Sequence, residues 1–107
     1  MFKKMKKINV MSTIYKISYH KDIKKVSGDD GENMTLGIID YINREIRIFD
    51  NGNTEEIFKT LIHEIMHAVA VEMNLSECWT TETEERIIDG FAVGMADTLL
   101  RNGLIKL

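Results

Sequence analysis

Three residues in the middle of the chain, His63, Glu64 and His67, have types and spacing that could support a specific chemistry, since they read His-Glu-x-x-His. On a helix, the two histidines lie one turn above each other and can chelate one zinc ion. The glutamate beside the first histidine can then act as a base on a water molecule bound to that ion. The motif therefore predicts a metal centre on a helix.

The sequence must supply at least one further ligand, because a zinc site in a protein needs three or more. Some zinc enzymes place a third histidine six residues after the second, but Met73 occupies that position here. The remaining histidine, His20, lies far away in a segment with loop composition. Carboxylates near the start of the next predicted helix are the alternative: Glu82, Glu84 and Glu85. Composition and spacing leave open which of the three is the ligand.

Two predicted helices position these residues. The first begins at Asn53, which together with Glu56 has the form of a capping box, and ends near residue 74. The second begins with another capping box, formed by Thr81 and Glu84, and continues to about residue 102, where Gly103 suits the position after its end. Apolar residues at helical spacing predict the buried faces: Phe58, Leu61, Ile62, Ile65, Met66, Val69 and Met73, then Ile87, Ile88, Phe91, Ala92, Met95, Ala96, Leu99 and Leu100.

Helix geometry favours Glu85 as the third ligand. His67 lies about 10 Å before the end of the first helix, and Glu85 lies about 6 Å into the second. A short connection makes the two helices antiparallel neighbours, so these residues reach similar heights. Asp89 follows one turn after Glu85 and could accept a hydrogen bond from the second ring nitrogen of a zinc-bound histidine, which would fix its tautomer.

The amino-terminal half has strand patterns. Residues 8–19 are rich in β-branched and aromatic side chains, and residues 36–41 and 45–49 form a predicted hairpin. Residues 20–32 read as a loop, with turn chemistry between Ser27 and Gly31. The predicted fold class is therefore α+β. A small antiparallel sheet of about three strands packs on two antiparallel helices that hold the zinc site, in one domain over residues 1–107.

Charge and cysteine content narrow the class of protein. The net charge of −3 does not favour nucleic-acid binding, and the basic run at residues 3–7 is short and reads as a solvated end. No apolar signal segment follows that run, and no stretch is long enough to span a membrane. The single cysteine, Cys78, excludes an internal disulfide and fits a reducing compartment. We therefore expect a cytoplasmic protein with no nucleic-acid or membrane partner.

The motif and its continuation resemble a known group of enzymes. His63-Glu64-x-x-His67 followed by Glu85-x-x-x-Asp89 resembles the gluzincin metallopeptidases, the thermolysin-like group. Residues 85–92 also look like the second-helix motif of ImmA/IrrE-type peptidases, and the layout of the chain is similar to small phage and mobile-element proteins of that kind. The specific part of this resemblance is five positions. It implies that His63, His67 and Glu85 are zinc ligands, Glu64 the general base and Asp89 a carboxylate that orients a ligand.

The function expected from motif and resemblance is hydrolysis of peptide bonds, with one zinc ion per chain. A peptide or protein substrate could bind in an extended conformation along an edge strand, such as residues 36–41. Larger gluzincins stabilise the oxyanion with a downstream histidine or tyrosine, and none follows His67 here. Four earlier residues are candidates for that role: Tyr15, Tyr19, His20 and Tyr41. The alternative function is a zinc-stabilised binding or regulatory module of a phage or mobile element, without proteolytic activity. The oligomeric state is not indicated.

Overall fold

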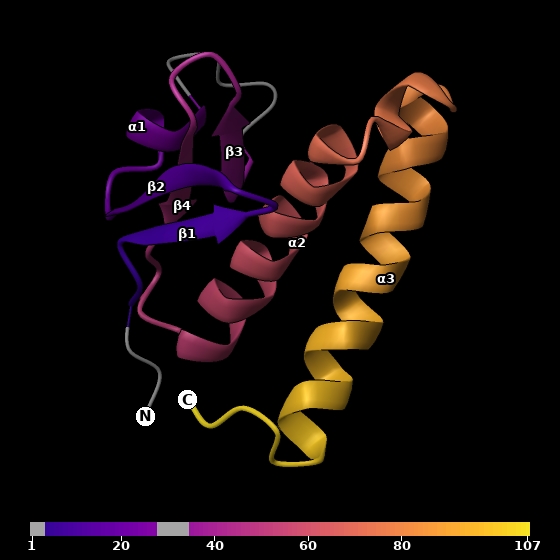
Figure 1. Ribbon diagram of the computed structural model, residues 1–107. Helices are drawn as coiled ribbons and strands as arrows, with labels where there is room; N and C mark the ends of the chain where they lie inside the picture. Colours follow the sequence, from indigo (N-terminus) through magenta and orange to yellow (C-terminus); the bar gives the residue numbers. More distant parts are fainter. Residues whose placement is uncertain (1–3, 28–34) are drawn as a thin grey trace.

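A computed structural model describes residues 4–27 and 35–107 of the chain. It has an α+β fold, as predicted, with a four-stranded sheet, three α-helices and one 3-10 helix in these residues. Helix α2 lies between the sheet and helix α3 (Figure 1). The elements, in chain order, are β1 (Lys7–Val10), β2 (Thr13–His20), α1 (Lys24–Ser27), β3 (Gly37–Asp40), β4 (Glu45–Phe49), α2 (Thr54–Glu72), η1 (Leu75–Glu77) and α3 (Thr81–Arg101).

The prediction of a single strand over residues 8–19 is wrong, because this segment is a hairpin of β1 and β2. The turn residues Met11 and Ser12 have φ angles of 50° and 77°, and Val10 pairs with Thr13 across the turn. Two left-handed residues in succession match the backbone twist of a two-residue hairpin. Glycine and asparagine are typical of such turns, and neither occurs at these two positions. The sequence pattern therefore did not indicate a turn between two strands.

The sheet is mixed rather than purely antiparallel, and it has four strands in the order β1-β2-β4-β3. Strand β4 pairs with β2 in parallel and with β3 antiparallel, which places β3 at an edge of the sheet. Strand β3 follows β2 in the sequence but does not pair with it, and β4 lies between β2 and β3 in the sheet. This order places Ile46 and Ile48 of β4, both fully buried, in the middle of the sheet.

The predicted loop at residues 20–32 is partly helical. Residues 24–27 form α1, in which Val26 is fully buried and Ser27 N–H donates to the carbonyl of Ile23. The turn chemistry from Gly28 to Gly31 lies outside the described residues. The burial of Val26 anchors this part of an otherwise polar segment to the domain.

Helix α2 forms the centre of the domain. Its amino terminus is capped as predicted, because the Asn53 side chain accepts a hydrogen bond from the N–H of Glu56. The Glu56 side chain instead accepts from Asn51, so the capping box is half formed. One side of α2 packs on the sheet and makes the main core: Val10, Tyr15, Ile17, Ile46, Ile48, Ile57, Leu61 and Ala68. Of the predicted face of α2, Phe58 and Leu61 are buried.

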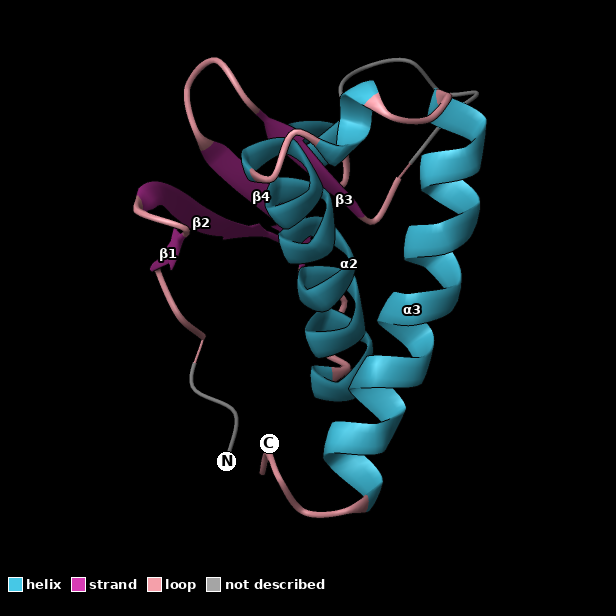
Figure 2. Ribbon diagram, turned by 45° about the vertical axis from the view of Figure 1, so that its right-hand side comes forward, coloured by secondary structure: helices cyan, strands magenta, loops and turns pink. Residues whose placement is uncertain are grey.

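Helix α3 runs antiparallel to α2 and packs on its other side (Figure 2). It begins one residue earlier than predicted, since Thr80 is the N-cap, and Gly103 ends it with a φ of 67°. Among its predicted apolar residues, only the stripe Ile88, Ala92 and Ala96 is buried. Phe91 is 62% exposed. The small alanines allow a close helix pair along a narrow line, so the contact face is narrower than the apolar pattern.

No helix in the described part of the chain is long and apolar enough to cross a lipid bilayer.

The last residue of α2, Glu72, joins the helix to the β1–β2 hairpin. Its carboxylate accepts hydrogen bonds from Thr13 Oγ1 at 2.6 Å and from the Tyr15 hydroxyl at 2.9 Å. These bonds hold the pKa of Glu72 below its usual value, because they favour the charged form. The hairpin is thereby tied to the carboxyl end of the central helix.

Replacing Glu72 with glutamine should lower the free energy of unfolding at neutral pH. The contribution of this carboxylate is fully present above its unfolded-state pKa of about 4.3, and it is lost as the pH falls through the lower folded-state pKa. Urea denaturation should therefore show a clear difference between wild type and Glu72→Gln at neutral pH, and little difference in strong acid. The matched control is Glu77→Gln, an exposed carboxylate of η1, which should leave the stability at neutral pH close to that of the wild type. A constant difference at all pH values would contradict this account.

Candidate metal centre

The two histidines of the motif and Glu85 lie together between α2 and α3. One ligand atom from each of His63, His67 and Glu85 can be chosen so that all three lie within 4.8 Å of one another. His67 Nε2 is 3.3 Å from Glu85 Oε1, and His63 Nε2 is 4.0 Å from Glu85 Oε2. Of the three glutamates considered from the sequence, Glu85 is the one that lies in this group, as helix geometry favoured. The exposed Glu82 is outside this group.

The donor set fits a zinc ion. Two imidazole nitrogens and one carboxylate are common zinc ligands, and zinc distances of about 2.1 Å in a tetrahedron place ligand atoms about 3.4 Å apart. The separations in this group, with one ligand atom taken from each residue, are at most 4.8 Å, so side-chain movements of an ångström or so would reach that value. His63 Nε2 is also buried without a hydrogen-bond partner. A buried polar nitrogen normally has a partner, and a metal ion would provide one.

Burial also prepares His63 for a metal. Its pKa is lowered, first by burial and then by the neighbouring ring of His67, while Asp89 and Glu85 act in the opposite direction. The neutral imidazole is the form that ligates a metal. The two histidine rings are 4.9 Å apart between centroids, as expected for residues one helical turn apart.

A carboxylate orients His67. Glu84 Oε2 lies 2.9 Å from His67 Nδ1, which leaves Nε2 of the same ring facing Glu85. Glu84 is held in turn by hydrogen bonds from Ser76 Oγ and from Trp79 Nε1. Burial alone would raise the pKa of Glu84, but the hydrogen bonds from Ser76, Trp79 and His67 outweigh the effect of burial and hold this pKa low. A charged carboxylate on the remote nitrogen of a histidine is the usual support of a metal ligand.

This role of Glu84 was not predicted from the sequence, which favoured stabilisation of the helix dipole. The available signal was weak: Glu84 directly precedes the ligand candidate Glu85 and lies close in sequence to the donors Ser76 and Trp79. Only the angle between α2 and α3 brings it to His67.

The sequence predicts that Asp89 accepts a hydrogen bond from the second ring nitrogen of a zinc-bound histidine, without indicating which one, and the structure places Asp89 beside His63. Its Oδ1 lies 3.0 Å from His63 Nε2, which is the nitrogen that also faces Glu85. This contact lacks hydrogen-bond geometry. The structure therefore brings the two side chains together without showing the Nδ1 contact that would orient the ring.

Glu64 is buried beside His63, His67 and Glu85, which we call the ligand group, and its exposed fraction is 5%. Its pKa is raised to about 7, mainly because burial disfavours the charged carboxylate. His67 opposes this shift, and Glu85 and Asp89 add to it. A carboxylate with a pKa near neutrality is suited to take up and release a proton.

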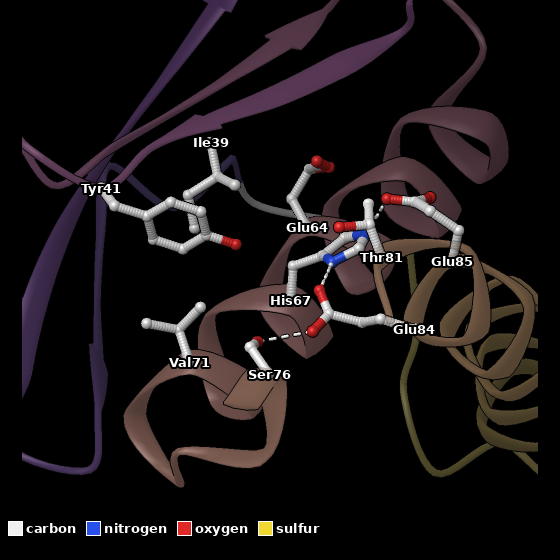
Figure 3. A pocket seen from close by; sticks show the side chains of 9 residues that line it. All are labelled: Ile39, Tyr41, Glu64, His67, Val71, Ser76, Thr81, Glu84 and Glu85. Atoms are coloured by element: carbon white, nitrogen blue, oxygen red, sulfur yellow. Dashed lines mark hydrogen bonds and ion pairs between the residues drawn. The ribbon is translucent and has the colours of Figure 1, made fainter. Parts of the chain in front are cut away.

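Two hollows of about 380 Å³ each meet at Glu64, His67 and Glu85 and form a cleft along the edge strand β3. Figure 3 shows these three side chains opposite Ile39 and Tyr41, which come from the sheet side. The first hollow is lined by Ile39, Tyr41, Glu64, His67, Val71, Ser76, Thr81, Glu84 and Glu85. The second is lined by Thr35, Leu36, Gly37, Thr60, His63, Glu64, His67 and Glu85. His63, His67 and Glu85 thus lie in a groove beside β3, which is an edge strand of the sheet in the described residues.

Comparisons of the chain with protein-family models, with curated proteins and with solved structures find no match. The gluzincin resemblance therefore rests on five positions of this sequence.

Gly37 sets the distance between β3 and α2 at the cleft. A Cβ atom at this position would lie 2.7 Å from Thr60 Cγ2, 3.1 Å from Glu64 Cγ and 3.3 Å from Ile48 Cδ1. The first distance is shorter than any ordinary carbon–carbon contact. The absence of a side chain at Gly37 is therefore what allows the strand edge to approach the helix beside Glu64.

Gly37→Ala should destabilise the fold by about 1–3 kcal/mol, because overpacking forces β3 and α2 apart. The matched control is Gly90→Ala on α3, where an added Cβ meets nothing within 4 Å and alanine should stabilise the helix by about 0.5–1 kcal/mol. Chemical denaturation of both variants tests this. Adding Thr60→Ser, which removes the closest methyl group, should recover part of the loss. Equal effects of the two glycine substitutions would show that the close approach is unimportant.

Proposed function

We propose that this protein is a zinc-dependent peptidase. The observation that carries the proposal is the convergence of His63, His67 and Glu85 beside the buried Glu64, in a cleft that follows an edge strand. A purely structural zinc site is closed by four protein ligands, whereas a catalytic site has three and keeps a position open. A site that only links two helices would also have no use for a buried carboxylate next to the ligands.

A zinc ion bound by these three side chains would polarise a peptide carbonyl and lower the pKa of a coordinated water. Glu64 accepts a proton from the attacking water as the water oxygen bonds to the carbonyl carbon. It then returns this proton to the amide nitrogen as the carbon–nitrogen bond breaks. Glu84 keeps Nε2 of His67 directed at the site through the contact with Nδ1.

The edge strand β3 suits an extended substrate. Its inner side pairs with β4, so its outer backbone groups face the cleft that contains Glu64. A peptide that adds to this edge would receive main-chain hydrogen bonds, and its side chains would alternate between the cleft and solvent.

The rival function is a zinc-stabilised binding module, in which the same ligands link α2 to α3. The exposed apolar side chains of α3, Phe91, Val93 and Met95, favour a role in contacts with another molecule. Binding of a hydroxamate or phosphoramidate to the zinc-loaded protein separates the two functions. Tight binding requires an open coordination position and supports the peptidase, whereas no binding supports the module.

Glu64→Gln should abolish most hydrolysis while keeping the metal. We expect a loss of about 10²–10⁴-fold in kcat, since glutamine cannot accept the proton, with one zinc ion per chain retained. The measurement combines cleavage of a peptide library, followed by mass spectrometry, with metal analysis of the same samples. Unchanged hydrolysis by a zinc-loaded Glu64→Gln protein would rule out this mechanism.

Zinc affinity should fall further when Glu85 is replaced than when its neighbour Glu84 is replaced. Glu85→Ala removes a ligand and should abolish stoichiometric zinc binding, whereas Glu84→Gln removes the charge behind His67 and should weaken affinity by about 10–100-fold. The matched control is Glu82→Ala, an exposed residue of the same helix turn, which should bind zinc like the wild type. Competition with a chromophoric chelator measures all four proteins. Equal affinities for wild type and Glu85→Ala would exclude the site as described.

A further inference from the structure

Peptide hydrolysis through a tetrahedral intermediate places negative charge on the former carbonyl oxygen. Enzymes stabilise that oxyanion with positioned hydrogen-bond donors. This need is acute here, because Glu64, Glu84 and Glu85 surround the cleft with carboxylates. Four histidine and tyrosine residues that precede the motif are candidates for such a donor: Tyr15, Tyr19, His20 and Tyr41.

The structure removes three of the four earlier candidates. Tyr15 is 1% exposed, and its hydroxyl donates to Glu72. The Tyr19 hydroxyl donates to the carbonyl of Met5, and the ring of His20 bonds to Ser18. None of these three candidates lines the cleft at the ligand group.

Tyr41 differs from the other three in position. It directly follows β3 and lines the first hollow together with Glu64, His67 and Glu85. Figure 3 shows its hydroxyl directed into the space in front of Glu64 and His67. The hydroxyl has no hydrogen-bond partner among residues 4–27 and 35–107, so it is available to a bound molecule.

The turn after β3 holds Tyr41 in place. Asp40 Oδ1 accepts hydrogen bonds from the N–H groups of Ile42 and Asn43, each at 3.0 Å, and Asp40 Oδ2 accepts from Asn43 Nδ2 at 2.8 Å. These three bonds join the residue before Tyr41 to the two residues after it. A donor on a backbone fixed in this way loses little freedom when it binds.

The electrostatic surroundings keep this hydroxyl protonated. Burial, followed by the charges of Glu84 and Glu64, raises the pKa of Tyr41. The hydroxyl therefore remains a hydrogen-bond donor throughout the neutral range. It is a neutral donor among carboxylates, and so it can approach a developing negative charge that those carboxylates would repel.

We propose that Tyr41 is a catalytic residue whose hydroxyl donates a hydrogen bond to the oxyanion of the tetrahedral intermediate. This inference rests on the proposed peptidase function and adds to it a donor for the oxyanion.

Tyr41→Phe tests the proposal in the zinc-loaded full chain, because it removes only the hydroxyl. Two zinc-directed probes are compared by calorimetry: an N-phosphoryl dipeptide, whose tetrahedral anion resembles the intermediate, and a thiol dipeptide with the same side chains, which lacks those oxygens. We expect Tyr41→Phe to weaken the phosphoryl probe by about 10–100-fold and to leave the thiol probe and the zinc content unchanged. In peptide cleavage, kcat should fall by about 100-fold with little change in KM.

The matched control is Tyr19→Phe, which also removes one tyrosine hydroxyl but lies outside the cleft, and it should bind both probes like the wild type. Equal weakening of both probes in Tyr41→Phe would overturn the proposal, since Tyr41 would then serve general binding. Unchanged binding of the phosphoryl probe would also overturn it. If Glu64→Gln is inactive while Tyr41→Phe keeps the wild-type kcat, the peptidase function stands and only the role of Tyr41 fails. Failure of the wild type to bind zinc would remove both.

Discussion

The arrangement of this domain depends on the burial of helix α2 on two sides. Ile57, Leu61 and Ala68 pack on the sheet, and Glu64 lies on the same side of the helix, close to Gly37 of β3. His63 and His67 lie on the side that faces α3. Polar groups buried in this way are costly unless they have partners. The position of α3 and the chemistry of its first turn follow from that requirement.

The partners of the buried His67 form one connected arrangement across the two helices. Glu84 contacts His67 and is itself held by Ser76 and Trp79 from the connection between the helices. The same first turn of α3 places Glu85 at the other nitrogen of His67. The first turn of α3 therefore supplies both a partner for the buried His67 and the carboxylate of the proposed metal site.

The sheet contributes to the same site through its edge strand β3, which lies close to α2 and lines the cleft. Strand β4 occupies the position beside β2, and this leaves β3 at the edge with Gly37 against α2 and Tyr41 at the mouth of the cleft. A purely antiparallel meander of three strands, as the sequence pattern suggested, would not define this placement. The parallel β2–β4 pairing is thus a structural condition for the cleft.

Local signals in the sequence determined the α+β class, both helices, their caps within one residue and the group His63, His67 and Glu85 as neighbours. These features depend on short-range rules: helical period, capping hydrogen bonds and the antiparallel packing of helices joined by a short connection. The tertiary structure alone decided the β1–β2 turn without glycine, the strand order, the contact of Glu84 with His67 and the place of Tyr41. The strand order, the contact of Glu84 with His67 and the place of Tyr41 depend on the packing of segments distant in sequence. The β1–β2 turn depends on left-handed backbone conformations at Met11 and Ser12, which these residue types do not predict.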